Sequence, residues 1–341
     1  MITVAMYFHH RCATSNSPSP RSRSAPGTSR CATGRSRWSS ATPAEGSTPL
    51  DAGHTLSDTG EHYLAGLLAQ GCSSLRTPAT SAPLGFGAVP VSRLDQVTVP
   101  AEYRYDLLYR WGEATGITAG MPAFRPDASN SAADQALQAG MHHDGMHFFP
   151  LGRDGTRGLL VLNHEYTDEA LLHADGARGA NSLERVRKSQ HAMGVSVIEV
   201  AAGPGGWRQV RPSAYARRIH GNTPMRIAGP AAGAPAMRTA LDPAGDTVRG
   251  TFANCAMGVT PWGTYLTCEE NFHGYFGGPG KAPPDWPASL ARYGVAPGGQ
   301  WVDWWQHDER FDVTRHPHEA HRFGWVVEID PMRSEERRVG K

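Results

Sequence analysis

Residues 251–276 hold the sequence pattern that most constrains the fold of this chain. They read T-F-A-N-C-A-M-G-V-T-P-W-G-T-Y-L-T-C-E-E-N-F-H-G-Y-F, two strand-like segments on either side of a T-P-W-G turn. Proline is favoured at the second position of a tight turn and glycine near its end, so the pattern predicts a β-hairpin. With Pro261 and its neighbour at the centre of the turn, Val259 is expected to pair with Thr264.

This register places Cys255 opposite Cys268, next to Glu269 and Glu270. A thiolate suits iron or zinc, whereas clustered carboxylates suit calcium or magnesium, so the four side chains are candidate metal ligands. Two other interpretations stay open, a cross-strand disulfide between the cysteines and a solvated strand end for the glutamates. Adjacent strand residues point to opposite faces, so both glutamates can reach one metal only if the strand has ended there.

The composition excludes several classes of partner. The 341 residues carry 33 basic and 32 acidic side chains, a net charge of +1, which gives no basic field for nucleic acid. No apolar run is long enough for stable membrane insertion, and we expect a monomer. The 39 glycines and 26 prolines, with nine tryptophans and ten tyrosines, favour a loop-rich all-β protein.

The chain divides into three parts by composition. Residues 1–83 are rich in Ser, Arg, Ala and Pro without aliphatic periodicity, which predicts a disordered segment, a mistranslated one or an unprocessed leader. Strand-like segments begin at Leu84, so residues 84–332 are expected to form the folded domain. Residues 333–341 resemble a translated sequencing adapter, and we interpret them as non-native.

Two further polar motifs follow or precede strand-like segments. The string N-H-E-Y-T-D, residues 163–168, comes directly after an aliphatic strand and supplies oxygen donors. Asn222 and Arg226 lie in a cationic, amide-bearing loop that could hold phosphate. The alternatives are a polar turn for the first motif and ordinary surface charge for the second.

Several separated strings together resemble the PhoX family of alkaline phosphatases. They are G-F-G-A-V-P-V-S, Y-R-W-G, H-D-G-M-H-F-F-P-L, V-L-N-H-E-Y-T-D, R-R-I-H-G-N-T-P-M-R-I-A-G-P-A-A-G, N-C-A-M-G-V-T-P-W-G-T-Y-L-T-C-E-E-N-F and R-F-G-W-V-V-E-I-D-P, in family order from Leu84 to Pro331. The long N-C-A to C-E-E-N string is the most diagnostic of them.

The resemblance implies a six-bladed β-propeller, partial in this chain, that hydrolyses small phosphomonoesters with an iron and calcium cluster. An oxygen held by the metals would then be the nucleophile. It further implies a periplasmic or secreted protein exported by the twin-arginine route, although residues before Leu84 contain no recognisable signal. In the family pattern Cys255 matches an iron ligand, and Glu269, Glu270 and Glu165 match acidic ligands. Candidates for additional metal or phosphate contacts are Asp144, His164, Asn222 and Arg226.

Two competing functions are compatible with the same residues. A calcium-dependent propeller hydrolase of the lactonase type would use carboxylates and amides without a thiolate. A non-catalytic propeller that serves as a binding scaffold would instead pair Cys255 with Cys268. Iron at the site would favour the phosphatase over both.

Overall fold

The computed structural model describes residues 86–299, 301–333 and 335–340. These residues fall in two compact units, 86–104 in one and 105–340 in the other. Residues 86–104 form turns and bends, and the helices and strands of the described residues all lie in the second unit. The predicted disordered or leader segment, residues 1–83, lies outside the described residues.

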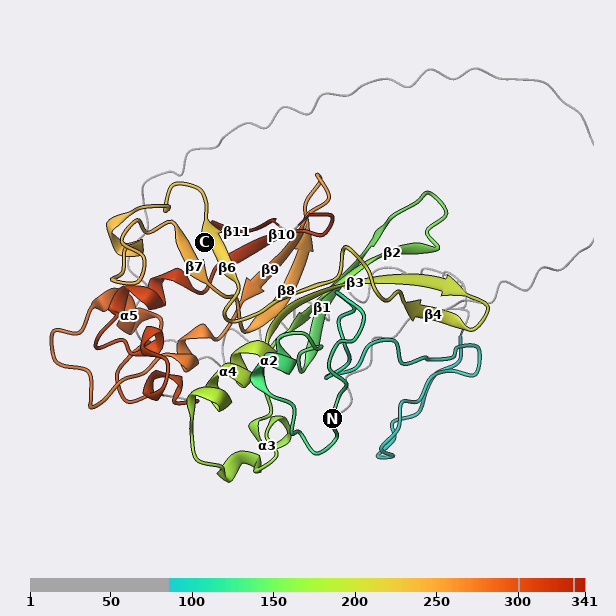
Figure 1. Ribbon diagram of the computed structural model, residues 1–341, viewed down its shortest axis with the longest axis horizontal. Helices are drawn as coiled ribbons and strands as arrows, with labels where there is room; N and C mark the ends of the chain where they lie inside the picture. Colours follow the sequence, from blue (N-terminus) through green and yellow to red (C-terminus); the bar gives the residue numbers. More distant parts are fainter. Residues whose placement is uncertain (1–85, 300, 334, 341) are drawn as a thin grey trace, which may run out of the picture. The chain divides into compact units, whose positions relative to one another are not determined.

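Short strands dominate the second unit, with a few short helices between them (Figure 1). The strands are β1 (His143–Pro150), β2 (Arg157–His164), β3 (Gly194–Gly203), β4 (Gly206–Gln209), β5 (Arg217–Ile219), β6 (Pro224–Ile227), β7 (Thr247–Arg249), β8 (Asn254–Val259), β9 (Tyr265–Glu269), β10 (Val326–Asp330) and β11 (Glu335–Gly340). The helices are α2 (Ala132–Gln135), α3 (Glu169–Leu172), α4 (Leu183–Ala192) and α5 (Ala288–Arg292). Short 3-10 helices cover Gly176–Arg178, Pro235–Met237, Phe272–Tyr275, Trp304–Gln306, Glu309–Phe311 and Pro317–Arg322.

The first sheet has the order β1-β2-β3-β4, and β5 also pairs with β3. Its central strand β2 is buried along nearly its whole length, because successive side chains enter two different apolar clusters. Leu159 and Val161 belong to the main core, whereas Leu160 and Leu162 pack in a second cluster on the opposite face. Since side chains alternate along a strand, this fixes which face each residue after Leu162 presents.

The second sheet has the order β7-β6-β11-β10-β9-β8, with β11 parallel to β6 and the other pairs antiparallel. Its strand β8 packs against β1 and β2 of the first sheet (Figure 1). The main apolar core joins the sheets, since it includes Leu159 and Val161 from the first and Tyr265 and Val327 from the second.

The predicted hairpin forms as β8 and β9, but its predicted register is wrong by one residue next to the turn. Val259 pairs with Tyr265 instead of Thr264. The amide of Gly263 donates to the Thr260 carbonyl at 3.0 Å, as expected for the turn, yet Gly263 has φ of 86°. A glycine in this left-handed conformation after a four-residue turn adds one residue to the loop as a bulge, which shifts the pairs next to the turn. A second irregularity, between Asn254 and Met257, restores the predicted register where Asn254 pairs with Glu269.

The expected all-β class is confirmed in a coarser form, a mostly β protein with few helices. None of the helices in the described residues is both long enough and apolar enough to cross a bilayer. Within residues 333–341, predicted to be a non-native tail, residues 335–340 pair as β11 with β10 and β6.

A buried carboxylate with two arginine partners makes the stability of the second unit pH-dependent. Asp308 is 5% exposed, and its Oδ2 accepts from Arg310 at 3.1 Å, from Arg187 at 3.1 Å and from Gln190 at 3.0 Å. Burial alone raises the pKa of Asp308, but the guanidinium charges and the hydrogen bonds outweigh it and hold this pKa below its usual value. The charged form is therefore favoured in the folded state.

We expect Asp308→Asn to lower the free energy of unfolding by about 2 kcal/mol at pH 6. Because the folded pKa is depressed, the contribution of Asp308 is present above the unfolded pKa and disappears as pH falls through the folded one. Urea unfolding of both proteins from pH 6 to pH 3 should show the difference shrinking. The exposed substitution Asp285→Asn serves as control, and a gap that stays constant with pH would contradict the assignment.

Candidate metal centre

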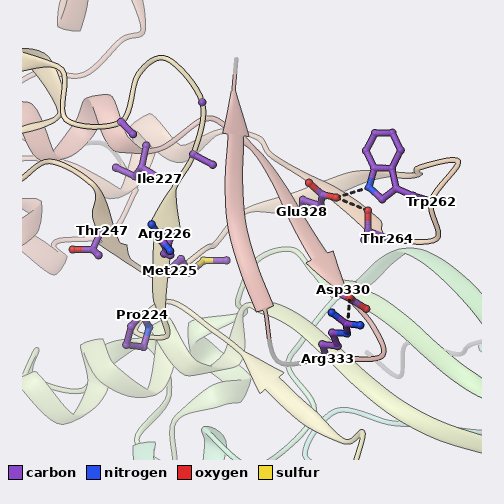
Figure 2. A pocket seen from close by; sticks show the side chains of 13 residues that line it. Pro224, Met225, Arg226, Ile227, Thr247, Trp262, Thr264, Glu328, Asp330 and Arg333 are labelled. Atoms are coloured by element: carbon purple, nitrogen blue, oxygen red, sulfur yellow. Dashed lines mark hydrogen bonds and ion pairs between the residues drawn. The ribbon is translucent and has the colours of Figure 1, made fainter.

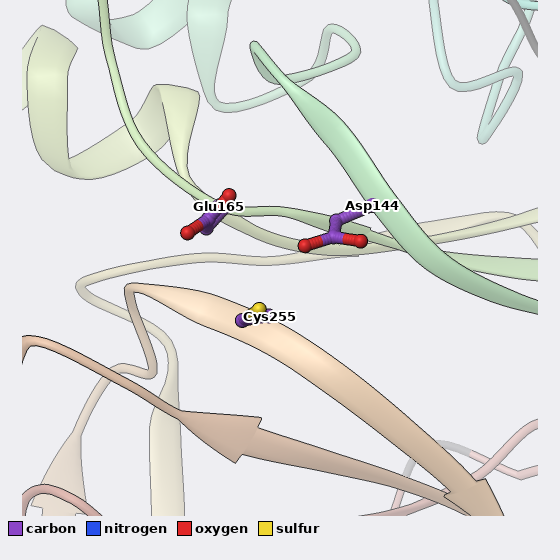
Figure 3. A group of neighbouring side chains, drawn as sticks. All are labelled: Asp144, Glu165 and Cys255. Carbon is purple, nitrogen blue, oxygen red and sulfur yellow. The ribbon is translucent and has the colours of Figure 1, made fainter. Parts of the chain in front are cut away.

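Three potential ligands from separate segments of the chain converge beside the contact between the sheets (Figure 3). One carboxylate oxygen each from Asp144 and Glu165 and the Sγ of Cys255 all lie within 4.8 Å of one another. Asp144 belongs to β1, Glu165 follows the last residue of β2, and Cys255 is the second residue of β8. All three residues are partly exposed, so the cluster is open to solutes.

Two β-bulges aim Asp144 and Cys255 at each other. In β1, His143 pairs with His164 and Met146 with Leu162, so Asp144 and its neighbour together oppose a single residue of β2. In β8 the register shifts by one between Asn254 and Met257, at the position of Cys255. A bulge turns the side chain that follows it toward the other face of a sheet, and such features are frequent next to active sites.

A glycine allows β1 and β8 to approach closely enough to form this cluster. A Cβ on Gly145 would lie 2.7 Å from Cγ of Met257 and 2.9 Å from the Cys255 carbonyl oxygen. Both distances are shorter than real Cβ contacts, so a larger residue would push the strands apart. The Asp-Gly pair in the sequence was the visible signal of this bulge.

A buried amide ties the strands together behind the ligands. Asn163, fully buried on β2, donates from Nδ2 to the Cys255 carbonyl at 2.7 Å. Its Oδ1 lies 2.9 Å from the hydroxyl of Tyr265 on β9, which also lies 2.7 Å from the Gly145 carbonyl. The sequence identified Asn163 as an oxygen donor near a strand end, whereas the structure gives its side chain a positioning role.

Strained backbone surrounds the cluster. Of the four non-glycine residues with positive φ in the described part of the chain, three lie within two positions of a candidate ligand, namely His142 at 47°, Ala253 at 54° and Asn271 at 47°. Each such backbone conformation costs roughly 1–3 kcal/mol and persists where the surrounding structure holds the residue in place. The His142 carbonyl accepts from the Glu165 amide at 3.0 Å, and the Ala253 carbonyl from the Glu270 amide at 2.7 Å.

The cluster accumulates negative charge. Burial, together with the nearby charges of Asp144 and Glu270, raises the pKa of Glu165. A hydrogen bond to the Glu270 carboxylate, followed by burial and by Asp144, raises the pKa of Cys255 to about 12. Three carboxylates and one thiol therefore share a small space in which the ionised forms of Glu165 and Cys255 are disfavoured. A bound cation would reverse this effect, so the donor set fits a metal ion.

The two glutamates after Cys268 are separated by the structure. β9 continues through Glu269, which pairs with Asn254, and its carboxylate accepts from the Trp325 amide at 3.1 Å. Glu270 lies beyond the strand end, exposed and beside Cys255. The described structure thus brings Cys255, Glu165, Asp144 and Glu270 together, and Glu269 is directed elsewhere. Cys255 and Cys268 are both free thiols, without the cross-strand disulfide.

His164 lies on the opposite face of the first sheet. Its Nε2 is 2.6 Å from the Ser196 hydroxyl, in the cluster that contains Tyr109. Burial and the nearby charges of Arg218 and His143 hold the pKa of His164 well below its usual value, so the ring is neutral. This side chain supports the sheet from behind rather than facing the three ligands, as strand alternation requires.

The remaining two candidates lie in other surroundings. Asn222 is enclosed by Arg187, Arg310 and Gln190, and its Nδ2 donates to the Gln190 side chain at 2.7 Å. Arg226 is exposed on β6 and lines a separate cavity of about 1100 Å³ (Figure 2). In that cavity, the Glu328 carboxylate accepts from Trp262 at 2.8 Å and from Thr264 at 2.6 Å. The acidic group of this cavity is therefore hydrogen-bonded by uncharged donors.

Comparison with known proteins gives a consistent result. A family model described as alkaline phosphatase PhoX matches residues 84–340. Among solved structures, Pseudomonas fluorescens PhoX in complex with vanadate, a transition state analogue, is similar with a TM-score of 0.70 and 43% identity. The match covers 74% of this chain and 43% of that chain, so the chain spans less than half the length of this relative.

No curated protein matches the chain significantly. The family model nevertheless spans most of the sequence, including the strands that carry Asp144, Glu165 and Cys255. The chain therefore belongs to the PhoX family of alkaline phosphatases.

Proposed function

We propose that this chain provides a metal-dependent phosphomonoesterase site of the PhoX type. The observation that carries the proposal is the convergence of one thiol and two carboxylates within 4.8 Å, in a chain of this family. The vanadate complex of the similar Pseudomonas fluorescens protein supports phosphoryl chemistry, because vanadate is named there as a transition state analogue.

The donor chemistry divides the ligands between two kinds of cation. Cys255 would hold iron, for which a soft thiolate is suited, while Asp144, Glu165 and Glu270 would hold calcium through hard oxygens. When bound, these cations supply Lewis-acid stabilisation of the phosphoryl oxygens. Without them, the carboxylates repel a phosphate dianion, so the affinity of the chain for phosphate esters depends on the cations.

The remaining features of the proposal follow from family membership. The two sheets would be part of a six-bladed β-propeller, with residues 84–332 as the native folded domain. The substrates would be small phosphomonoesters, and the protein would act as a monomer in the periplasm or outside the cell after twin-arginine export.

The purified chain, supplied with iron and calcium, is expected to hydrolyse p-nitrophenyl phosphate and to lose this activity on treatment with a chelator. Readdition of both cations should restore it, because the carboxylate cluster again becomes able to accept the phosphate. Release of p-nitrophenol, measured beside the metal content of the same sample, tests this. Full metal loading without hydrolysis would contradict the proposal, and opening of a lactone with calcium alone would favour the competing hydrolase.

A further inference from the structure

A second cavity, separate from the one around Arg226, begins at the candidate metal centre. Its volume is about 460 Å³, and Glu165, one of the three converging ligands, forms part of its wall. Pockets of a few hundred Å³ with apolar walls and a few polar groups are typical binding sites for small molecules. Because it shares Glu165 with the ligand cluster, a molecule held at the cluster would have its remaining atoms next to this cavity.

The walls of the cavity are mainly aromatic and aliphatic. Tyr166, Tyr275 and Trp301 line it together with Ala253 and Val302. The Trp301 ring is 6.0 Å from the Tyr275 ring, nearly perpendicular to it, and remains 55% exposed. Tyr166 is 44% exposed, while its ring stacks on His142 at 3.8 Å. Large rings held in place but left exposed offer faces for another flat group.

The one acidic wall residue beyond Glu165 is already satisfied. The carboxylate of Glu169 accepts from Thr167 at 2.6 Å and from Ser189 at 2.8 Å, and lies 2.9 Å from Nε2 of His173. The Glu169 carboxylate is therefore hydrogen-bonded within the protein and does not require a ligand. Apart from Glu165, Thr167 and Asn271, the rest of the wall consists of aromatic and aliphatic side chains.

We infer that this cavity binds the organic group of the substrate and selects phosphomonoesters that carry an aromatic ring. The inference rests on the proposed phosphatase function, since the phosphoryl group is taken to lie at the cluster of Asp144, Glu165 and Cys255. The ring would pack against Trp301 and Tyr166, where each contact replaces water on an apolar face.

The test compares benzyl phosphate with ethyl phosphate, whose alcohol leaving groups are similar in basicity, so their ratio of kcat/KM reports recognition of the ring. The native chain is expected to prefer benzyl phosphate, and Trp301→Ala to reduce the benzyl-to-ethyl ratio about tenfold. Tyr166→Ala gives a second site, also partly exposed, in case Trp301→Ala fails to fold. Trp262→Ala, at a ring 70% exposed on the distant β8–β9 turn, is the matched control and should keep the native ratio.

Binding of two non-hydrolysable analogues separates this inference from the proposed function. Benzylphosphonate should bind more tightly than ethylphosphonate in calorimetric titration of the metal-loaded chain, and both cavity variants should weaken only this preference. If hydrolysis is absent but the preference is present, the phosphatase proposal fails and the aromatic pocket stands. Equal binding of both phosphonates, or a preference unaffected by the Trp301 and Tyr166 substitutions, would overturn the inference.

Discussion

Cys255→Ala is expected to reduce iron affinity of the chain by at least ~100-fold, because it removes the one soft donor of the converging set. Calcium binding through Asp144, Glu165 and Glu270 should persist, since these hard oxygen donors remain. Metal content measured by mass spectrometry after equilibration with both cations checks this expectation. Hydrolysis of p-nitrophenyl phosphate should fall with the iron.

Cys268→Ala is the matched control for this substitution. Both cysteines are free and partly exposed on neighbouring strands, but Cys268 lies outside the group of converging ligands. Its replacement should leave iron content at the native level. Iron retained by the Cys255 variant, or lost equally by both variants, would refute the assignment of Cys255.

Asn163→Ala is expected to lower the free energy of unfolding by about 3–4 kcal/mol. The substitution leaves the Cys255 carbonyl and the buried Tyr265 hydroxyl without the amide of Asn163 as partner. Urea unfolding measures the loss. Because the same amide holds β8 against β2, iron affinity should also decrease, although no metal ligand has been removed.

Two comparisons distinguish positioning from general damage. Asn181→Ala removes an exposed amide whose Nδ2 donates to the Asp303 carbonyl at 3.1 Å, and it should cost less than about 1 kcal/mol without changing iron affinity. Tyr265→Phe keeps the ring and removes only its hydroxyl, so it should reproduce part of the effect of Asn163→Ala. An Asn163 variant with lower stability but native iron affinity would show that this side chain does not position Cys255.

The local patterns of the sequence predicted much of the secondary structure. Proline and glycine at the β8–β9 turn predicted a hairpin, and the hairpin exists, because turn conformations depend on only a few adjacent residues. Its register next to the turn differed by one residue, since the left-handed conformation of Gly263 lengthened the loop. The alternation of side chains along a strand, which has a period of two residues, does not reveal such a register shift before the loop conformation is known.

The sequence by itself determined the family, through separated strings between Leu84 and Pro331, and it identified Cys255 and Glu165 as ligand-type residues. Only the tertiary structure decided which acids accompany them. Two bulges and the close approach at Gly145 bring Asp144 to Cys255, while strand alternation turns Glu269 and His164 away. A metal centre requires donors from distant segments at one point, and the spacing of residues along one chain does not encode that convergence.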